Sequence, residues 1–441
     1  MILGHFVNID FPSQEQLANL KYYKYAAVDK SYITKYVLSH YWNWAITLCP
    51  TWIAPNLITL IGLIFMLVNV FLVAIIVPGL GTEAPSWLYF SFAAGLWIYS
   101  TLDNIDGKQA RRTGTSSPLG ELFDHGCDAL NTTYVSLLQA AALGLGHTQL
   151  SAILFIVTAA GFYLSTAEEY YTGVLYLGYV NGPTEGIILT CLAFIWSGVY
   201  GAASWHVSLT EIWFFGWLPR GTTAAQVFVW GTVVLFFIMH FPVVFYSIYK
   251  ACKEKSLDCF HAFMVTLLPM IVFCCAEYYW IASPDSIILQ DEHLVLFSLA
   301  TGTLFGSMAS NIILAHLTRS SYPKLTGIVA SVVAMAVLVN SQSVLGIRLI
   351  SAQAEYVLLW LLLTAAVVYY GIWAKLVIDG FCQYLGIRCF VIRRVKPEPL
   401  IRNESEEDSL LDQEEGIVPT EAAATSLPSS SADNTYSTFR H

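Results

Sequence analysis

One polar stretch, residues 103–128, stands out in a chain that is otherwise very apolar. It reads DNIDGKQARRTGTSSPLGELFDHGCD and holds four aspartates, Asp103, Asp106, Asp124 and Asp128. Side chains three or four residues apart share one face of an α-helix, so the spacing predicts two helices that each present two carboxylates. Gathered carboxylates bind cations, and this is the first chemistry that the sequence indicates.

Small and basic residues accompany the first two aspartates. With about 100° of turn per residue, the same helix face also carries Gly107, Ala110 and Arg111. The two small residues leave room for a bulky ligand, and an arginine can donate two hydrogen bonds to a phosphate group. This face is therefore suited to a substrate that contains a diphosphate.

The second helix adds an acid and a histidine to its two aspartates. Glu121 and His125 lie four residues apart and share the stripe of Asp124 and Asp128. Between the two helices, residues 113–118 are rich in Gly, Ser, Thr and Pro and predict a tight connection. The pattern therefore predicts a helical hairpin that brings the two polar faces together.

Four clustered carboxylates repel one another and are costly to hold at membrane depth unless cations neutralise them. Oxygen ligands with open positions for a phosphate group suit Mg²⁺ or Mn²⁺, and a shared carboxylate from each helix can bridge two such ions. The hairpin therefore predicts a divalent-metal site, with two ions as the expected number.

The motif resembles the pattern of the CDP-alcohol phosphotransferase class-I family, D-x-x-D-G-x-x-A-R, eight residues, then G-x-x-x-D-x-x-x-D. All of its fixed positions are present here, as Asp103, Asp106, Gly107, Ala110, Arg111, Gly120, Asp124 and Asp128. The segments ELFDHGCD and WIAPNLIT are similar to the eukaryotic choline and ethanolamine phosphotransferase branch. The resemblance extends over most of the chain and weakens towards its C-terminal tail.

This resemblance implies an enzyme that transfers phosphocholine or phosphoethanolamine from CDP-choline or CDP-ethanolamine to diacylglycerol. The products would be phosphatidylcholine or phosphatidylethanolamine and CMP. In the metal site, the resemblance implies that Asp103 and Asp124 bridge two ions, while Asp106 completes one coordination shell and Asp128 the other. It also implies a homodimer.

The resemblance places the CDP-alcohol at four residues, namely Asn56, Gly107, Arg111 and Gly120. Two of these residues could instead have structural roles. Asn56 follows Pro55, so its side chain could cap the helix that starts there. Gly120 could serve close helix packing.

The attacking hydroxyl group needs a base because a primary alcohol has a high pKa. His125 is the predicted general base, and Glu121, one helical turn before it, is predicted to orient its imidazole. Two alternatives stay open: Asp128 could act as the base, or His125 could be purely structural. The acidic pair Glu168–Glu169 is not assigned to the site, because relatives often carry a tryptophan where Ala167 stands.

The composition predicts an all-α polytopic membrane protein. The 441 residues are 56% hydrophobic and 12% charged, and the mean hydropathy is +0.59, too apolar for a soluble globule of this size. About ten windows are long enough to span a bilayer, at residues 54–77, 86–106, 119–146, 149–171, 183–203, 223–249, 259–282, 292–316, 324–345 and 354–379. An amphipathic helix lying in the membrane interface is predicted within residues 12–50.

Charge sets the expected orientation. If the N-terminus is cytosolic, only Arg220 and Arg348 of the 21 Lys and Arg residues fall on the opposite side. The active site and both termini are therefore predicted to be cytosolic, in the endoplasmic reticulum or the Golgi. The expected divisions are an N-terminal interfacial segment (1–50), a transmembrane catalytic domain (51–380), a basic juxtamembrane segment (381–402) and a disordered acidic tail (403–441).

Two other functions remain open at this stage. One is transfer to another alcohol, such as inositol, although enzymes of that kind are usually shorter. The other is cation transport, which also places acids and a histidine at membrane depth. The expected partners are the two substrates and the lipid bilayer, and no patch suited to nucleic acid is recognisable.

Overall fold

The computed structural model describes residues 12–392 except 212–213, 215 and 324–325. It is mostly helical, as predicted, and the chain is a polytopic membrane protein. Among the described residues, seven helices are long and apolar enough to cross a membrane: Pro55–Ile76, Gln149–Thr172, Gly182–Tyr200, Ala224–Glu254, Cys259–Ile281, Leu294–Leu317 and Ala352–Leu385. The predicted acidic tail, and the basic segment beyond residue 392, lie outside the described residues.

Helical structure is present at every one of the predicted spans. The long elements are α3 (Pro55–Ile76), α4 (Ser86–Thr113), α5 (Pro118–Ala142), α6 (Gln149–Thr172), α7 (Ile187–Tyr200), α8 (Ala224–Leu235), α9 (Phe241–Glu254), α10 (Cys259–Ile281), α12 (Leu294–Leu317), α13 (Thr326–Val339) and α15 (Ala352–Leu385). Three of these fall outside the seven: α13 has only 14 residues, and α4 and α5 carry the polar motif. Shorter helical turns are η4 (Gly182–Gly186), η5 (Ala202–His206), η6 (Leu209–Glu211), η8 (Phe236–His240), α11 (Ile287–Gln290) and α14 (Ser341–Leu345).

The predicted hairpin is formed by α4 and α5. Helix α4 ends at Gly114, which adopts a left-handed conformation (φ +66°) that a glycine accepts without a steric cost. Helix α5 begins at Pro118, and the Ser117 hydroxyl accepts a hydrogen bond of 3.3 Å from the Gly120 amide. Both helices pack against α3. The aspartates of the two helices meet in the half of the hairpin that is nearer its turn.

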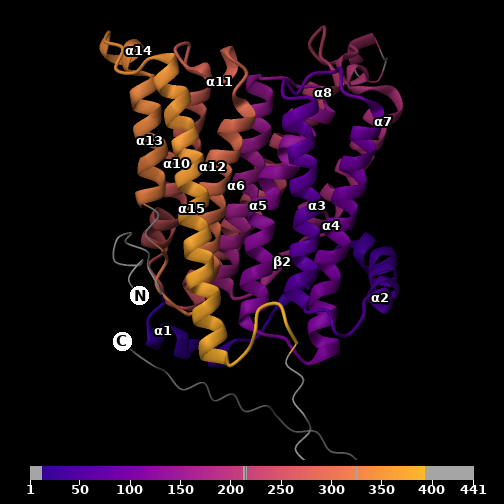
Figure 1. Cartoon of the computed structure of the whole chain (residues 1–441), viewed down its shortest axis with the longest axis vertical. Coiled ribbons are helices and arrows are strands. Elements are labelled where there is room, and N and C mark those ends of the chain that lie inside the picture. The colour runs from indigo at the N-terminus through magenta and orange to yellow at the C-terminus, as the bar shows by residue number, and fades with distance from the viewer. Residues whose placement is uncertain (1–11, 212–213, 215, 324–325, 393–441) are drawn as a thin grey trace, which may run out of the picture. The chain divides into compact units, whose positions relative to one another are not determined.

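Helix α12 is the most buried of the seven candidate spans and packs against α5, α6 and α15 (Figure 1). A β-carbon on Gly306 would lie only 2.8 Å from Leu130 Cδ2, so glycine allows the backbone of α12 to approach α5 closely. This close contact fixes the end of α12 beside the first turns of α5. His316 at this end of α12 lies close to Glu121 of α5.

The N-terminal segment contains several short elements besides the helix that was predicted within residues 12–50. It comprises α1 (Gln14–Ala18), η2 (Asn19–Tyr22), β1 (Ala27–Asp29), η3 (Thr34–Leu38) and α2 (Ser39–Leu48). The last part is helical without a break over residues 32–48, which lies within the predicted range, and α2 packs against α4. Its location in the membrane interface stays a prediction. The strand β1 pairs in parallel with β2 (Leu175–Leu177), which follows α6. Pairing with β2 competes with helix formation here, and the sequence alone does not reveal that partner.

Candidate active site

Three of the four motif aspartates form a tight group, here called the aspartate cluster: Asp103, Asp124 and Asp128. Their carboxylate oxygens all lie within 4.8 Å of one another. The Oδ1 atoms of Asp103 and Asp124 are buried and have no hydrogen-bond partner among the described residues. Buried carboxylate oxygens without donors are costly unless a cation satisfies them. The oxygen-only donor set therefore fits a hard divalent cation.

Hydroxyl groups orient two of the motif carboxylates. Tyr99 of α4 donates to Oδ1 of Asp128 at 2.6 Å, and Thr59 of α3 donates to Oδ2 of Asp106. Asp106 is buried but lies outside the group of three. Such contacts fix the direction of a potential metal ligand. Neither hydroxyl was identified from the sequence, because Thr59 and Tyr99 lie outside the motif.

The four residues predicted to bind the CDP-alcohol form two adjacent pairs. A β-carbon on Gly107 would lie 3.5 Å from Nη1 of Arg111, and one on Gly120 would lie 3.8 Å from Oδ1 of Asn56. Gly107 therefore lies beside the Arg111 guanidinium and Gly120 beside the Asn56 amide, each at an ordinary van der Waals distance.

Asn56 does not cap α3, so the capping role considered for it is wrong. The N-cap residue is Ala54, and no side chain caps this helix end. Asn56 is only 8% exposed, and its amide instead donates to the sulfur of Cys389 at 3.4 Å. Cys389 belongs to the segment that follows α15, so this segment reaches the predicted donor site.

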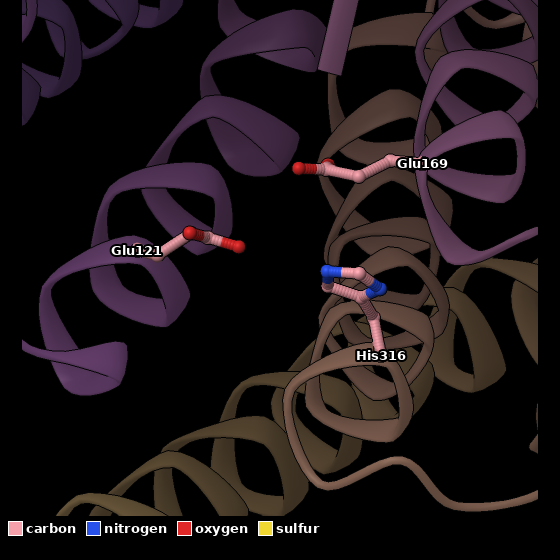
Figure 2. Close-up of side chains that lie close together, drawn as sticks. All are labelled: Glu121, Glu169 and His316. Atoms are coloured by element: carbon pink, nitrogen blue, oxygen red, sulfur yellow. The ribbon is translucent and has the colours of Figure 1, made fainter. Parts of the chain in front are cut away.

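A second polar group, here called the base cluster, lies beside the first: Glu121, His125, Glu169 and His316. Nδ1 of His125 is 3.5 Å from Oε2 of Glu169. Ligand atoms of Glu121, Glu169 and His316 all lie within 4.8 Å of one another. Figure 2 shows these three side chains pointing toward a common space from three different helices. Because His125 follows Asp124 directly on α5, the base cluster adjoins the aspartate cluster along this helix.

The sequence did not identify two members of the base cluster. Glu169 was set aside because Ala167 departs from the pattern of relatives, although an acidic pair in an apolar span is itself a signal of function. His316 stands at the end of α12, far from the motif in sequence, and no local pattern marks it. Glu121 accepts a hydrogen bond of 2.7 Å from Tyr23. Its predicted role as the orienter of His125 stays a prediction, and Glu169 is a second candidate.

Comparison with known proteins identifies the family of this chain. The family model for CDP-alcohol phosphatidyltransferase matches residues 52–246, which include the motif. Cholinephosphotransferase 1 of Saccharomyces cerevisiae is 35% identical over 71% of this chain and 80% of its own length.

Two further relatives match along nearly their whole length. Choline/ethanolaminephosphotransferase 1 of Arabidopsis thaliana is 33% identical over 86% of this chain and 97% of its own length. Ethanolaminephosphotransferase 1 of Homo sapiens is 29% identical over 89% of this chain and 97% of its own length. The chain therefore belongs to the CDP-alcohol phosphatidyltransferase class-I family of membrane enzymes.

Proposed function

We propose that this enzyme transfers phosphocholine or phosphoethanolamine from CDP-choline or CDP-ethanolamine to diacylglycerol. The observation that carries the proposal is the aspartate cluster, with its buried oxygens that lack partners among the described residues, beside a buried imidazole on the same helix. Relatives whose names include choline or ethanolamine phosphotransfer, matched along most of their length, support this choice of alcohol.

The donor would bind at the aspartate cluster between α4 and α5. Arg111 would donate to a phosphate oxygen, and Gly107 and Gly120 would leave space for the diphosphate. Asp103, Asp106, Asp124 and Asp128 would hold two Mg²⁺ or Mn²⁺ ions. When bound, these ions would neutralise the diphosphate and the charge that develops on the departing CMP.

The base cluster would activate the acceptor. The diacylglycerol hydroxyl oxygen would form a bond to the phosphorus next to the alcohol, while the bond from that phosphorus to the bridging oxygen breaks. CMP would leave with the bonding electron pair, and the hydroxyl proton would pass to Nε2 of His125. Glu169 faces the other ring nitrogen, Nδ1, at 3.5 Å. A carboxylate in that position holds the proton on Nδ1 and leaves Nε2 free to accept one.

Asp128 is the less suitable base. Its Oδ1 already accepts a hydrogen bond of 2.6 Å from Tyr99, and its carboxylate belongs to the group that fits a cation. An oxygen that already accepts a hydrogen bond, in a carboxylate that would bind a cation, is less available to take the proton of the acceptor.

We further propose ten membrane spans, with the active site and both termini in the cytosol and the endoplasmic reticulum as the compartment. The distribution of Lys and Arg supports this orientation. The transporter alternative is not carried forward, because the aspartates gather at one end of a hairpin and match an enzyme motif. A homodimer stays a prediction.

The test is CMP release by the purified protein in lipid nanodiscs with Mg²⁺ and diacylglycerol, supplying each CDP-alcohol separately. We expect release with CDP-choline, CDP-ethanolamine or both, and none when diacylglycerol is omitted. Release with neither donor would overturn the proposal. CMP release with CDP-inositol alone would show that the enzyme uses a different alcohol from the one proposed, within the same family.

A further inference from the structure

The N-terminal segment Ser13–Asp29, here called the strap, is fastened at one end to the C-terminal end of α12. Gln16 Nε2 donates to Ser320 Oγ and Asn19 Nδ2 donates to the carbonyl of Thr318, both at 2.8 Å. Leu17 and Leu20 are buried in a cluster that includes residues of α5, α12 and α15. This end of the strap therefore lies beside the last turn of α12, which carries His316.

The other end of the strap is fastened beside α6. Strand β1 pairs with β2, with Ala27 opposite Leu175. The amide of Leu175 donates to the carbonyl of Ala26 at 3.0 Å. Because β2 begins three residues after α6 ends, this attachment lies near the turn that carries Glu169. The residues between the two attachments must cross from α12 to α6, and in doing so they pass the first turn of α5.

Tyr23 makes the contact at that crossing. Its hydroxyl donates to Oε2 of Glu121 at 2.7 Å. Partial burial raises the pKa of Tyr23, and the negative charge of Glu121 raises this pKa further. The phenol therefore stays protonated at physiological pH and remains the hydrogen-bond donor. Hydrogen bonds to a carboxylate are among the stronger ones in proteins.

The geometry of Glu121 indicates what this bond does. Figure 2 shows the Glu121 carboxylate directed toward the space shared with Glu169 and His316. Without the Tyr23 hydroxyl, a flexible glutamate beside a second carboxylate would turn away, since two like charges within 4.8 Å repel each other. The Tyr23 hydroxyl offsets part of that repulsion by binding one oxygen of Glu121.

We propose that Tyr23 is a positioning residue of the active site, which acts by holding Glu121 in the base cluster. The strap then contributes to the catalytic rate as well as to the stability of the fold. This inference rests on the proposed function, in which the base cluster removes the proton of the acceptor hydroxyl.

The experiment compares CMP release by four variants at saturating Mg²⁺: Tyr23→Phe, Tyr22→Phe, Glu121→Gln and the double variant Tyr23→Phe/Glu121→Gln. Phenylalanine keeps the ring of Tyr23 and removes only the donor. We expect a kcat about ten-fold below wild type for Tyr23→Phe, with the KM for the CDP-alcohol within about two-fold of wild type. Tyr22, which is 50% exposed on the same strap, is the matched control and should leave kcat unchanged.

The double variant tests whether Tyr23 acts through Glu121. If it does, the double variant should be no slower than Glu121→Gln alone, because the two losses are not additive. Fully additive losses, or a kcat for Tyr23→Phe equal to that of Tyr22→Phe, would overturn the inference while the proposed function stands. A lower melting temperature with unchanged kcat would make the strap purely structural. A wild-type protein that releases no CMP overturns the proposed function, and the inference falls with it.

Discussion

The aspartate cluster and the base cluster share helix α5 but are assembled from very different distances along the chain. Every member of the aspartate cluster lies within 26 consecutive residues, on two helices joined by a short turn. The base cluster takes Glu121 and His125 from α5, Glu169 from α6 and His316 from α12. One site is thus encoded by a local motif, while the other exists only after the bundle has packed.

The two clusters also differ in how their polar atoms are satisfied. Two buried oxygens of the aspartate cluster lack a hydrogen-bond partner within the described part of the chain. In the base cluster, Glu169 faces the His125 ring and Glu121 is bound by Tyr23. This contrast indicates that the aspartate cluster needs a cation to be complete, whereas the base cluster is held together by the protein's own side chains.

The largest expected effect comes from the aspartate cluster. Asp124→Asn removes a charge from the predicted metal site, and we expect CMP release to fall by at least about a thousand-fold. Without divalent ions the melting temperature should not fall, because one buried charge has been removed from a group of like charges. Activity across a Mg²⁺ series and thermal unfolding with a chelator measure the two effects.

The control for this variant is Asp379→Asn, which changes an exposed aspartate paired with Lys375 at 2.5 Å. It should retain wild-type activity. If excess Mg²⁺ restored full activity to Asp124→Asn, the Asp124 carboxylate would not be required for catalysis, and the proposed dependence of the aspartate cluster on a cation would be contradicted.

A smaller effect is expected from the partner of the base. Glu169→Gln keeps the size of the side chain but removes the charge 3.5 Å from His125 Nδ1. We expect kcat to fall about ten- to hundred-fold with the Mg²⁺ requirement unchanged. The matched control is Glu168→Gln, at the neighbouring and equally buried acid. Equal losses in the two variants would mean that Glu169 has no specific role toward His125.

Local sequence patterns predicted the parts of the molecule that depend on neighbouring residues. The spacing of Asp103 and Asp106, and the Gly and Pro residues between the helices, correctly predicted the α4–α5 hairpin. Apolar windows predicted a helical membrane protein, because a spanning helix must satisfy its own backbone. Strand β1 of the strap was not predicted, since it depends on pairing with β2 about 150 residues away.

The same distinction explains the site residues that the sequence missed. Tyr23 and His316 contact the site only because α1 and α12 pack beside α5, and neither belongs to a recognisable motif. Thr59 orients Asp106 from α3 for the same reason. Side chains that act through tertiary contacts carry no periodicity of their own, so a single sequence does not reveal them.

The proposed mechanism assigns metal binding to the aspartate cluster and proton removal to the base cluster. These separate roles are tested most directly by measuring CMP release by the His125→Gln variant at saturating Mg²⁺, CDP-alcohol and diacylglycerol. Loss of a general base predicts a rate about hundred-fold or more below wild type. The Mg²⁺ concentration for half-maximal activity should stay at the wild-type value, because the aspartate cluster is intact. A rate close to wild type, with Asp128→Asn inactive in the same assay, would contradict the account and assign the base to Asp128.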